Sequence, residues 1–360
     1  MTAPQLLTPV TFRSVTARNR IAVAPMCQYC ATDGLGDDWH IQHLGARAMG
    51  GAGIVFTEAT HVSADARITP GCLGLYTDEH EALLARAVKL IEYAGSVAGI
   101  QLAHAGRKGA TVPPWDGARG LTEAEGAWQT HAPSAIPFGE GYATPVAFTA
   151  SEIAGVIEAF AASAARARRA GFKVIELHGA HGYLGHQFLS PISNRRTDAW
   201  GGDLAGRGRF LMELVEAVRG VWPDELPLFV RLSCTDWMAG GITIEDTVAL
   251  AKRLKETGKV DLIDASSGGI LAKGPVIPSL HPGYQVPFAE AIRHQAGMAS
   301  GAVGLITSPQ HAEEIVANGR ADLVLVARAV LADPAWPLRA AKALGASIAV
   351  PKQYGRATLT

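Results

Sequence analysis

The chain has 360 residues, of which 48% are hydrophobic and 18% are charged. This composition is typical of a globular protein with a large core, and it excludes a disordered or collagen-like chain. The 32 basic and 33 acidic side chains give a formal net charge of -1. A broad nucleic-acid-binding surface is therefore not expected, because such a surface needs excess positive charge to neutralise phosphates.

The hydropathy pattern argues against secretion and membrane insertion. Residues 1–20 have no apolar segment behind a basic start, so no secretory signal is predicted. No run of about 18 apolar residues occurs, so no transmembrane helix is predicted either. Four cysteines are too few for a disulfide framework at this length. We expect a cytoplasmic protein.

Two of the cysteines, Cys27 and Cys30, form a C-x-x-C pair. Such a pair is compatible with a redox dithiol or with a zinc site. No second pair follows, and a structural zinc ion needs further soft ligands. We favour neither interpretation.

Eight short apolar runs along the chain are predicted to be strands. Most are continuous rather than alternating, which is typical of parallel strands covered on both faces. The predicted strands are Ile21–Pro25, Ile54–Ala59, Ile100–His104, Val174–His178, Leu228–Ser233, Leu262–Ser267, Ala302–Thr307 and Leu323–Arg328.

Helical segments with recognisable caps lie between these runs. A Ser or Thr precedes each segment, and a Gly follows it, as expected at helix ends. The predicted helices follow Thr77 up to Gly95, Thr149 up to Gly171, Thr243 up to about Gly258, and Ser308 up to Asn318–Gly319.

This alternation predicts an α/β fold, a (β/α)8 TIM barrel formed as a single domain over residues 1–360. A doubly wound sheet is the competing arrangement, but no G-x-G-x-x-G motif follows any predicted strand. Residues 105–148 interrupt the alternation of strands and helices after the third strand. So long a segment between elements is usually functional, and we expect it to cap the mouth of the barrel.

In such barrels the chemistry lies at the carboxyl ends of the strands. The polar side chains near these ends are therefore candidate site residues, although each also has a purely structural explanation. Cys27 could be a small core residue, His178 a satisfied core histidine, and Lys108 a solvated cation. The candidates are Cys27, Tyr29, Gln101, Lys108, His178, His181, Tyr183, Arg231 and Arg328.

Arg231 is the hardest of these to explain as ordinary structure. It lies within the apolar run Leu228–Ser233. A buried guanidinium without a counter-charge costs several kcal/mol, on the order of 3–5. We therefore expect an anion beside Arg231, from either a side chain or a ligand.

The candidate set contains a thiol, phenols, imidazoles, an amide and cations, but no pair of carboxylates. Glycoside hydrolysis and an oxygen-ligand metal site are therefore not expected. Hydrogen-bond donors beside cations suit a site that stabilises developing negative charge.

Four separated motifs resemble the old yellow enzyme family of flavin-dependent ene-reductases. They begin at Asn19-Arg20-Ile21, Gln101-Leu102-Ala103-His104, His178-Gly179-Ala180-His181 and Ser193-Asn194-Arg195-Arg196, and they occur in the family's order. Cys27 with Tyr29 is similar to the bacterial xenobiotic-reductase and thermophilic-like subgroup. The resemblance extends from about Leu7 to Arg356.

The resemblance implies a TIM barrel that holds FMN non-covalently at its mouth, with NADPH or NADH as the hydride donor. It implies that Gln101 meets the pyrimidine edge of the flavin and that Arg231 lies beside N1 and O2. Arg328 and the backbone near Ala327 and 301–303 would bind the phosphate. The implied cofactor-binding residues are Ala24, Pro25, Met26, Cys27, Ala59, Gln101, Arg231, Ala327 and Arg328.

The resemblance further implies an activated alkene as substrate, such as an enone, a maleimide or a nitroalkene. His178 and His181 would hold its oxygen, and Tyr183 would donate the proton. Tyr29 would be a second donor or a pocket wall, Cys27 would tune the flavin, and Lys108 would approach the substrate.

A carboxyl-terminal arginine of this subgroup can reach into the site of a neighbouring subunit. Arg356, in the tail 346–360, matches it. We therefore expect a homodimer, or a tetramer built of dimers, in which Arg356 binds substrate.

Two alternatives remain open from the sequence. One is a metal-dependent TIM-barrel hydrolase that uses His178 and His181 as ligands, although the first strand offers Met26-Cys27-Gln28 rather than a His-x-His motif. The other is a binding barrel without catalytic activity.

Overall fold

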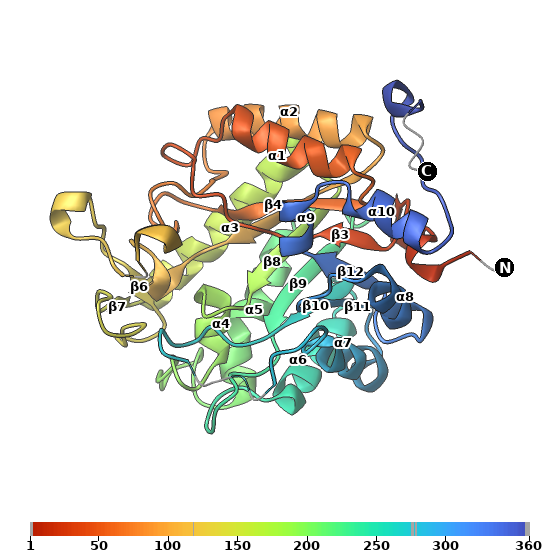
Figure 1. Ribbon diagram of the computed structural model, residues 1–360. Coiled ribbons are helices and arrows are strands. Elements are labelled where there is room, and N and C mark those ends of the chain that lie inside the picture. Colours follow the sequence, from red (N-terminus) through yellow and green to blue (C-terminus); the bar gives the residue numbers. More distant parts are fainter. Residues whose placement is uncertain (1–2, 118, 275–276, 278, 357–360) are drawn as a thin grey trace.

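The computed structural model describes residues 3–117, 119–274, 277 and 279–356, and its centre is a closed barrel of eight parallel strands (Figure 1). Each strand pairs with its predecessor and successor, and the last pairs with the first. Closure confirms the predicted (β/α)8 barrel and excludes the doubly wound sheet. The strands are β3 (Ile21–Val23), β4 (Ile54–His61), β5 (Val97–Ala103), β8 (Val174–Gly179), β9 (Leu228–Ser233), β10 (Leu262–Ser266), β11 (Ser300–Ala302) and β12 (Leu323–Val326).

The seventh strand lies earlier in the chain than predicted. It was expected over Ala302–Thr307, but β11 ends at Ala302. The backbone then turns, with φ of 123° at Gly304 and 54° at Leu305. An extended strand needs negative φ, so the following apolar residues form a loop instead. The other seven predictions overlap the observed strands.

The helices surround the barrel, and four of them begin at the predicted caps (Figure 1). The side chains of Thr77, Thr149, Thr243 and Ser308 each accept a hydrogen bond from the backbone N–H three residues later. These helices are α2 (Asp78–Tyr93), α3 (Ala150–Ala170), α6 (Ile244–Glu256) and α8 (Pro309–Ala317).

Six further helices were not predicted from caps. They are α1 (Asp38–Met49), α4 (Leu184–Leu189), α5 (Leu204–Arg219), α7 (Val286–Ala291), α9 (Arg328–Ala332) and α10 (Trp336–Ala343). None of the described helices is long and apolar enough to cross a membrane.

The barrel interior changes from apolar to polar along the strands. Side chains two residues apart on a strand share a face, so the inward-facing residues form successive levels. The lowest level is apolar, the middle level is charged, and the upper level is polar. In the order β8, β9, β10, the apolar level contains Val174, Phe229 and Leu262. The charged level contains Glu176, Arg231 and Asp264, and the polar level contains His178, Ser233 and Ser266.

A short hairpin closes the amino-terminal end of the barrel. Its strands, β1 (Val10–Phe12) and β2 (Val15–Ala17), pair antiparallel. The ring of Phe12 meets that of Phe229 edge-on, with 5.0 Å between centroids, inside one apolar cluster. The hairpin therefore excludes water beneath the charged level.

The insertion 105–148 contains the short strands β6 (His131–Ala132) and β7 (Val146–Ala147) and projects from one side of the barrel (Figure 1). The ring of Trp115 lies 5.6 Å from that of Tyr29, and the ring of Phe138 lies 4.5 Å from Nζ of Lys108. The insertion thus contributes side chains beside predicted site residues. Its role as a cap stays a prediction.

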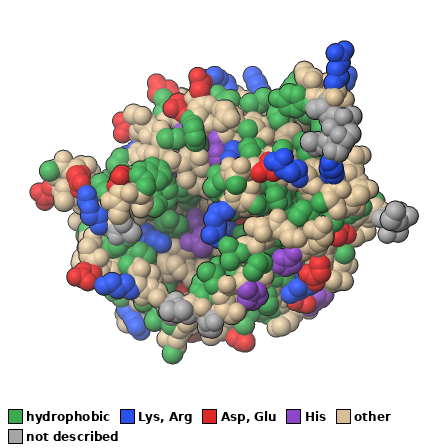
Figure 2. Space-filling view, viewed as in Figure 1, with side chains coloured by type: hydrophobic (Ala, Val, Ile, Leu, Met, Phe, Trp, Pro, Cys, Tyr) green, Lys and Arg blue, Asp and Glu red, His purple; other side chains and the backbone are tan. Residues whose placement is uncertain are grey.

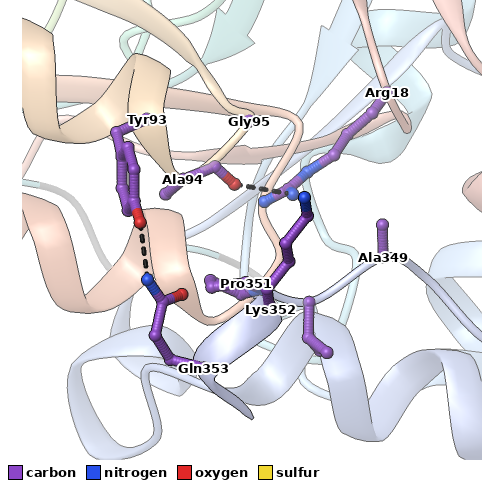
Figure 3. A pocket seen from close by; sticks show the side chains of 9 residues that line it. Arg18, Tyr93, Ala94, Gly95, Ala349, Pro351, Lys352 and Gln353 are labelled. Atoms are coloured by element: carbon purple, nitrogen blue, oxygen red, sulfur yellow. Dashed lines mark hydrogen bonds between the residues drawn. The ribbon is translucent and has the colours of Figure 1, made fainter. Parts of the chain in front are cut away.

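The carboxyl-terminal tail packs against the start of the chain and the end of α2. Gln353 donates a hydrogen bond to the Tyr93 hydroxyl at 2.6 Å, beside a cavity of about 410 Å³ that Arg18 also lines (Figure 3). Arg356 is exposed. Its contact with a neighbouring subunit stays a prediction, and residues 357–360 lie outside the described part.

Replacing Phe12 by Ala should lower the free energy of unfolding by about 3 kcal/mol, because it removes a buried ring from the lower level. Denaturant unfolding of this variant and of the exposed-site control Thr11→Ala measures the effect. Equal stability of the two variants would show that the hairpin does not pack into the barrel.

Candidate active site

Three of the predicted catalytic side chains meet at the end of β8. His178 is the inward-facing residue there, and the chain then turns tightly, with φ of 58° at His181. The His181 amide donates to Ser233 Oγ at 2.9 Å, which fixes this turn against β9. The ring centroid of His178 lies 5.2 Å from that of His181 and 5.1 Å from that of Tyr183.

The surroundings keep both imidazoles neutral and the phenol protonated. Burial, and then the charge of Arg231, hold the pKa values of His178 and His181 well below their usual range. Burial raises the pKa of Tyr183 well above its usual value. A neutral imidazole still has one N–H to donate, and a protonated phenol can act as an acid.

Lys108 lies over this cluster. Its ammonium is 4.6 Å from the ring centroid of Tyr183 and donates to the carbonyl oxygens of His181 at 2.8 Å and Gly269 at 3.3 Å. Burial, and then the charge of Arg107, lower the pKa of Lys108 to about 7. Lys108 is half-buried, and its ammonium is held by two carbonyl oxygens.

Cys27 and Tyr29 approach the same cluster from the loop after β3. Both pack, together with Tyr183, against a small apolar group that contains Cys72. Tyr29 has a φ of 55°, so the loop turns sharply there. Burial, and then Cys72, raise the pKa of Cys27 well above its usual value. Cys27 is therefore a thiol at neutral pH.

A cavity of about 370 Å³ opens beside the histidines. Arg231, Ala327 and Arg328 line it, as does the loop 303–307. Ser266 also lines it and lies 2.6 Å, Oγ to Nε2, from His181, so the cavity and the histidine cluster adjoin. A hollow with histidine and basic side chains is visible near the middle of the face in Figure 2.

Arg231 meets its negative charge within the barrel. Nε of Arg231 lies 2.8 Å from Oδ2 of Asp264, an ion pair that lacks hydrogen-bond alignment. Asp264 is fully buried, and burial raises its pKa to about 6. The side chain of Asp264 is therefore the anion that was expected beside Arg231.

Two carboxyl side chains that were not among the candidates lie within the strands, beneath the mouth of the barrel. Glu176 and Asp264 are both buried at the charged level, and the charge of Asp264 raises the pKa of Glu176. Gln101 donates from Nε2 to Glu176 Oε1 at 2.7 Å. The carboxylates lie within strands rather than at their ends, where the polar candidates were sought.

The remaining predicted residues fall around this mouth in different ways. Ala24 and Ala59 are buried, whereas Pro25 and Met26 are half-buried on the loop after β3. Ala327 and Arg328 lie at the end of β12 and line the cavity. Of the predicted backbone segment 301–303, Val303 lines it. Arg356 lies in the tail, apart from these residues.

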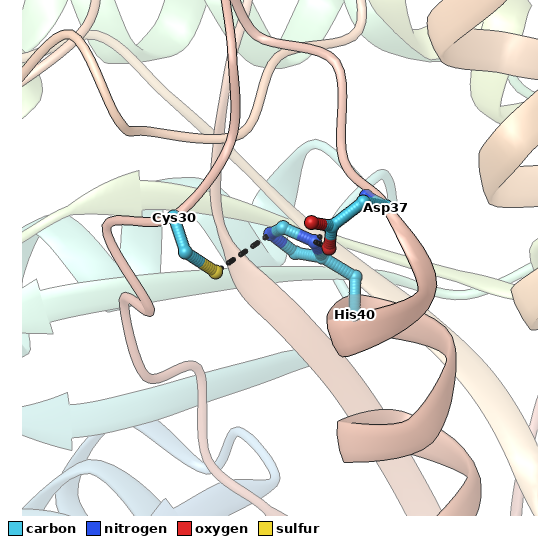
Figure 4. Close-up of side chains that lie close together, drawn as sticks. All are labelled: Cys30, Asp37 and His40. Atoms are coloured by element: carbon cyan, nitrogen blue, oxygen red, sulfur yellow. Dashed lines mark hydrogen bonds and ion pairs between the residues drawn. The ribbon is translucent and has the colours of Figure 1, made fainter.

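Cys30, Asp37 and His40 form a cluster of possible ligand atoms, but its geometry does not suit a single ion (Figure 4). Cys30 Sγ lies 3.8 Å from Nε2 of His40, whereas Asp37 Oδ1 lies 3.1 Å from Nδ1. The two partners face opposite ring nitrogens. In the described part of the chain, no such cluster includes His178 or His181.

Comparison with known proteins decides the family. Residues 5–346 match the NADH:flavin oxidoreductase / NADH oxidase family. The chain belongs to this family. It is therefore an oxidoreductase with FMN as its cofactor, and the family match does not favour the metal-dependent hydrolase.

Relatives of known name agree. An NADPH dehydrogenase of Geobacillus sp. (strain WCH70) is 50% identical over 353 residues, covering 98% of each chain. One of Listeria innocua is 46% identical over 355 residues, covering 98% of this chain and 99% of the relative. Morphinone reductase superposes with a TM-score of 0.78 at 28% identity, covering 98% of this chain and 92% of that one.

The cavity fits FMN on chemical grounds. Arg231 carries a buried positive charge, and Arg328 also lines the cavity. Two guanidinium groups suit a cofactor that has both an electron-accepting ring and a phosphate. Ser266, Phe138, Glu176 and Asp264 were not predicted as site residues. The last two carried a signal, since each is a charge within an apolar strand.

In a Glu176→Gln parent, replacing Asp264 by Asn should lower the free energy of unfolding by about 3 kcal/mol, because neither carboxylate of the charged level would then face the buried Arg231. Replacing both, with Arg231→Met and Asp264→Leu, should recover part of this loss. Denaturant unfolding of the parent and both variants measures the effect. Parental stability of Asp264→Asn would contradict the ion pair.

Proposed function

We propose that the chain catalyses NADPH-dependent reduction of the C=C bond of activated alkenes, with enones, maleimides and nitroalkenes as the substrate class. The observation that carries this proposal is the imidazole of His178. Its Nδ1 is buried beside His181 and Tyr183 and has no hydrogen-bond partner among the described residues. The name of the Geobacillus relative, NADPH dehydrogenase, supports NADPH as the hydride donor, and the name of morphinone reductase supports a reductase.

Residues of the barrel mouth would hold the cofactor. Gln101 and Arg231 bind the pyrimidine part of the flavin in this proposal, and Arg328 with the backbone at Ala327 binds the phosphate. Ala24, Pro25, Met26 and Ala59 line the ring, and Cys27 tunes it as a neutral thiol. Held by these residues, FMN would supply the hydride chemistry, from NADPH to the β-carbon of the alkene.

The two histidines bind the carbonyl or nitro oxygen of the substrate. His178 has the unpaired nitrogen, and His181 exchanges its contact with Ser266 for the substrate oxygen. Negative charge grows on that oxygen during reduction, so these hydrogen bonds strengthen in the transition state. The nearby positive charges of Lys108 and Arg231 also stabilise negative charge on that oxygen.

Tyr183 donates the proton to the α-carbon. Its raised pKa keeps the phenol protonated at neutral pH, as an acid requires. Tyr29 borders the same space as a second donor or as a wall. Its edge contact with Trp115 makes the insertion part of the substrate pocket.

We further propose that a homodimer completes the site, with Arg356 entering from the neighbouring subunit. The exposure of Arg356 and its place at the end of the tail are compatible with such a contact.

Replacing Tyr183 by Phe should lower the rate of cyclohexenone reduction about 100-fold, because the general acid is lost. His178→Ala should also lower it, because the donor to the substrate oxygen is lost. Both variants should remain yellow and accept hydride from NADPH at close to the parental rate. Anaerobic stopped-flow absorption measures the two half-reactions separately.

The matched control is Tyr76→Phe, which removes a hydroxyl that donates to the carbonyl oxygen of Asp33 and has no role in the proposal. Enone reduction at the rate of this control in both site variants would overturn the assigned roles.

A further inference from the structure

Glu176 is a fully buried carboxyl directly beneath the predicted flavin contacts, and the mechanism above gives it no role. It is the cross-strand neighbour of Gln101 and accepts from Gln101 Nε2 at 2.7 Å. Its other oxygen, Oε2, has no hydrogen-bond partner among the described atoms. A carboxylate in such a position would be costly, because burial penalises its charge.

The groups around Glu176 come from the two neighbouring strands, β5 and β9, and from β10 beyond them. Gln101 lies on β5, Arg231 on β9, Asp264 on β10, and His178 two residues further along β8. Burial, and then Asp264, raise the pKa of Glu176 to about 8. The charge of Arg231 lowers the pKa of Glu176, but Arg231 is already ion-paired with Asp264.

The charge balance of this level favours one proton on the carboxyl pair. With both carboxyls ionised, two negative charges face one guanidinium, and the level carries a net charge of about -1 without water to screen it. With one proton the level is neutral. Asp264 touches Arg231, so the ionised carboxylate belongs there and the proton belongs on Glu176.

We propose that Glu176 is a positioning residue that carries a proton at neutral pH and orients the side-chain amide of Gln101 toward bound FMN. The contact uses the Nε2 end of Gln101, so the Oε1 end remains free to accept from the flavin. An uncharged Glu176 also adds no second anion beneath the ring. This inference rests on the placement of FMN against Gln101 proposed above.

Infrared spectroscopy of the FMN-bound enzyme tests the protonation directly. A protonated carboxyl has a carbonyl band that carboxylates lack and that shifts in D2O. The parent should show this band at pH 7, Glu176→Gln should lose it, and the exposed-site control Glu216→Gln should keep it. Retention of every such band in Glu176→Gln would overturn the proposal.

FMN affinity, measured from the fluorescence of released FMN on dilution, tests the positioning. Glu176→Leu should weaken binding about tenfold, because Gln101 loses its partner. Glu176→Gln keeps an uncharged acceptor and should stay within about threefold of the parent. In a Gln101→Leu background, Glu176→Leu should have no further effect.

These readouts separate failure of the inference from failure of the proposed function. If Glu176→Gln weakens FMN binding as much as Glu176→Leu, then the negative charge matters and the inference is wrong. If Gln101→Leu leaves FMN affinity unchanged, the cofactor placement is wrong, and the positioning role falls with it. Neither readout requires alkene reduction, so an enzyme with another substrate gives the same result.

Discussion

The guanidinium of Arg231 is buried within the barrel, and its positive charge requires a negative charge beside it. Asp264, on the neighbouring strand β10, supplies this negative charge. The pair lies between an apolar level, which the amino-terminal hairpin seals from water, and a polar level that carries the histidines. Since one cation cannot balance two carboxylates, the proton content of Glu176 follows from the same constraint.

The same cation affects the chemistry at the mouth. Its charge helps to keep His178 and His181 neutral, so each imidazole is a hydrogen-bond donor rather than a fixed cation. Ser266 contacts His181 and lines the cavity that Arg231 also lines. The proposed substrate donors and the FMN-binding cavity are therefore parts of one connected arrangement.

Much of this arrangement could be predicted from the sequence, because buried parallel strands and capped helices have local signals. Thr149 and Gly171, for example, bound α3 as predicted. The seventh strand was misplaced because apolar composition cannot distinguish a strand from a buried loop, and the positive φ of Leu305 has no sequence signal.

The polar residues of the site were predicted from the sequence. The balance of charge between Arg231, Glu176 and Asp264 was not. Arg231 was recognised as a charge within an apolar strand, and Glu176 and Asp264 obey the same rule on their own strands. They were missed because the search was confined to strand ends. Which anion would meet Arg231 depends on the register of β9 and β10, which is a tertiary property.

In the proposal, the mouth of the barrel binds FMN, and hydride passes from NADPH to an activated alkene there. The most direct test is the visible absorption spectrum of the purified protein, recorded anaerobically before NADPH, after NADPH, and after cyclohexenone. We expect yellow flavin bands that bleach with NADPH and return with the enone. A colourless protein that also fails to take up added FMN, or bands that bleach but do not return, would contradict the account.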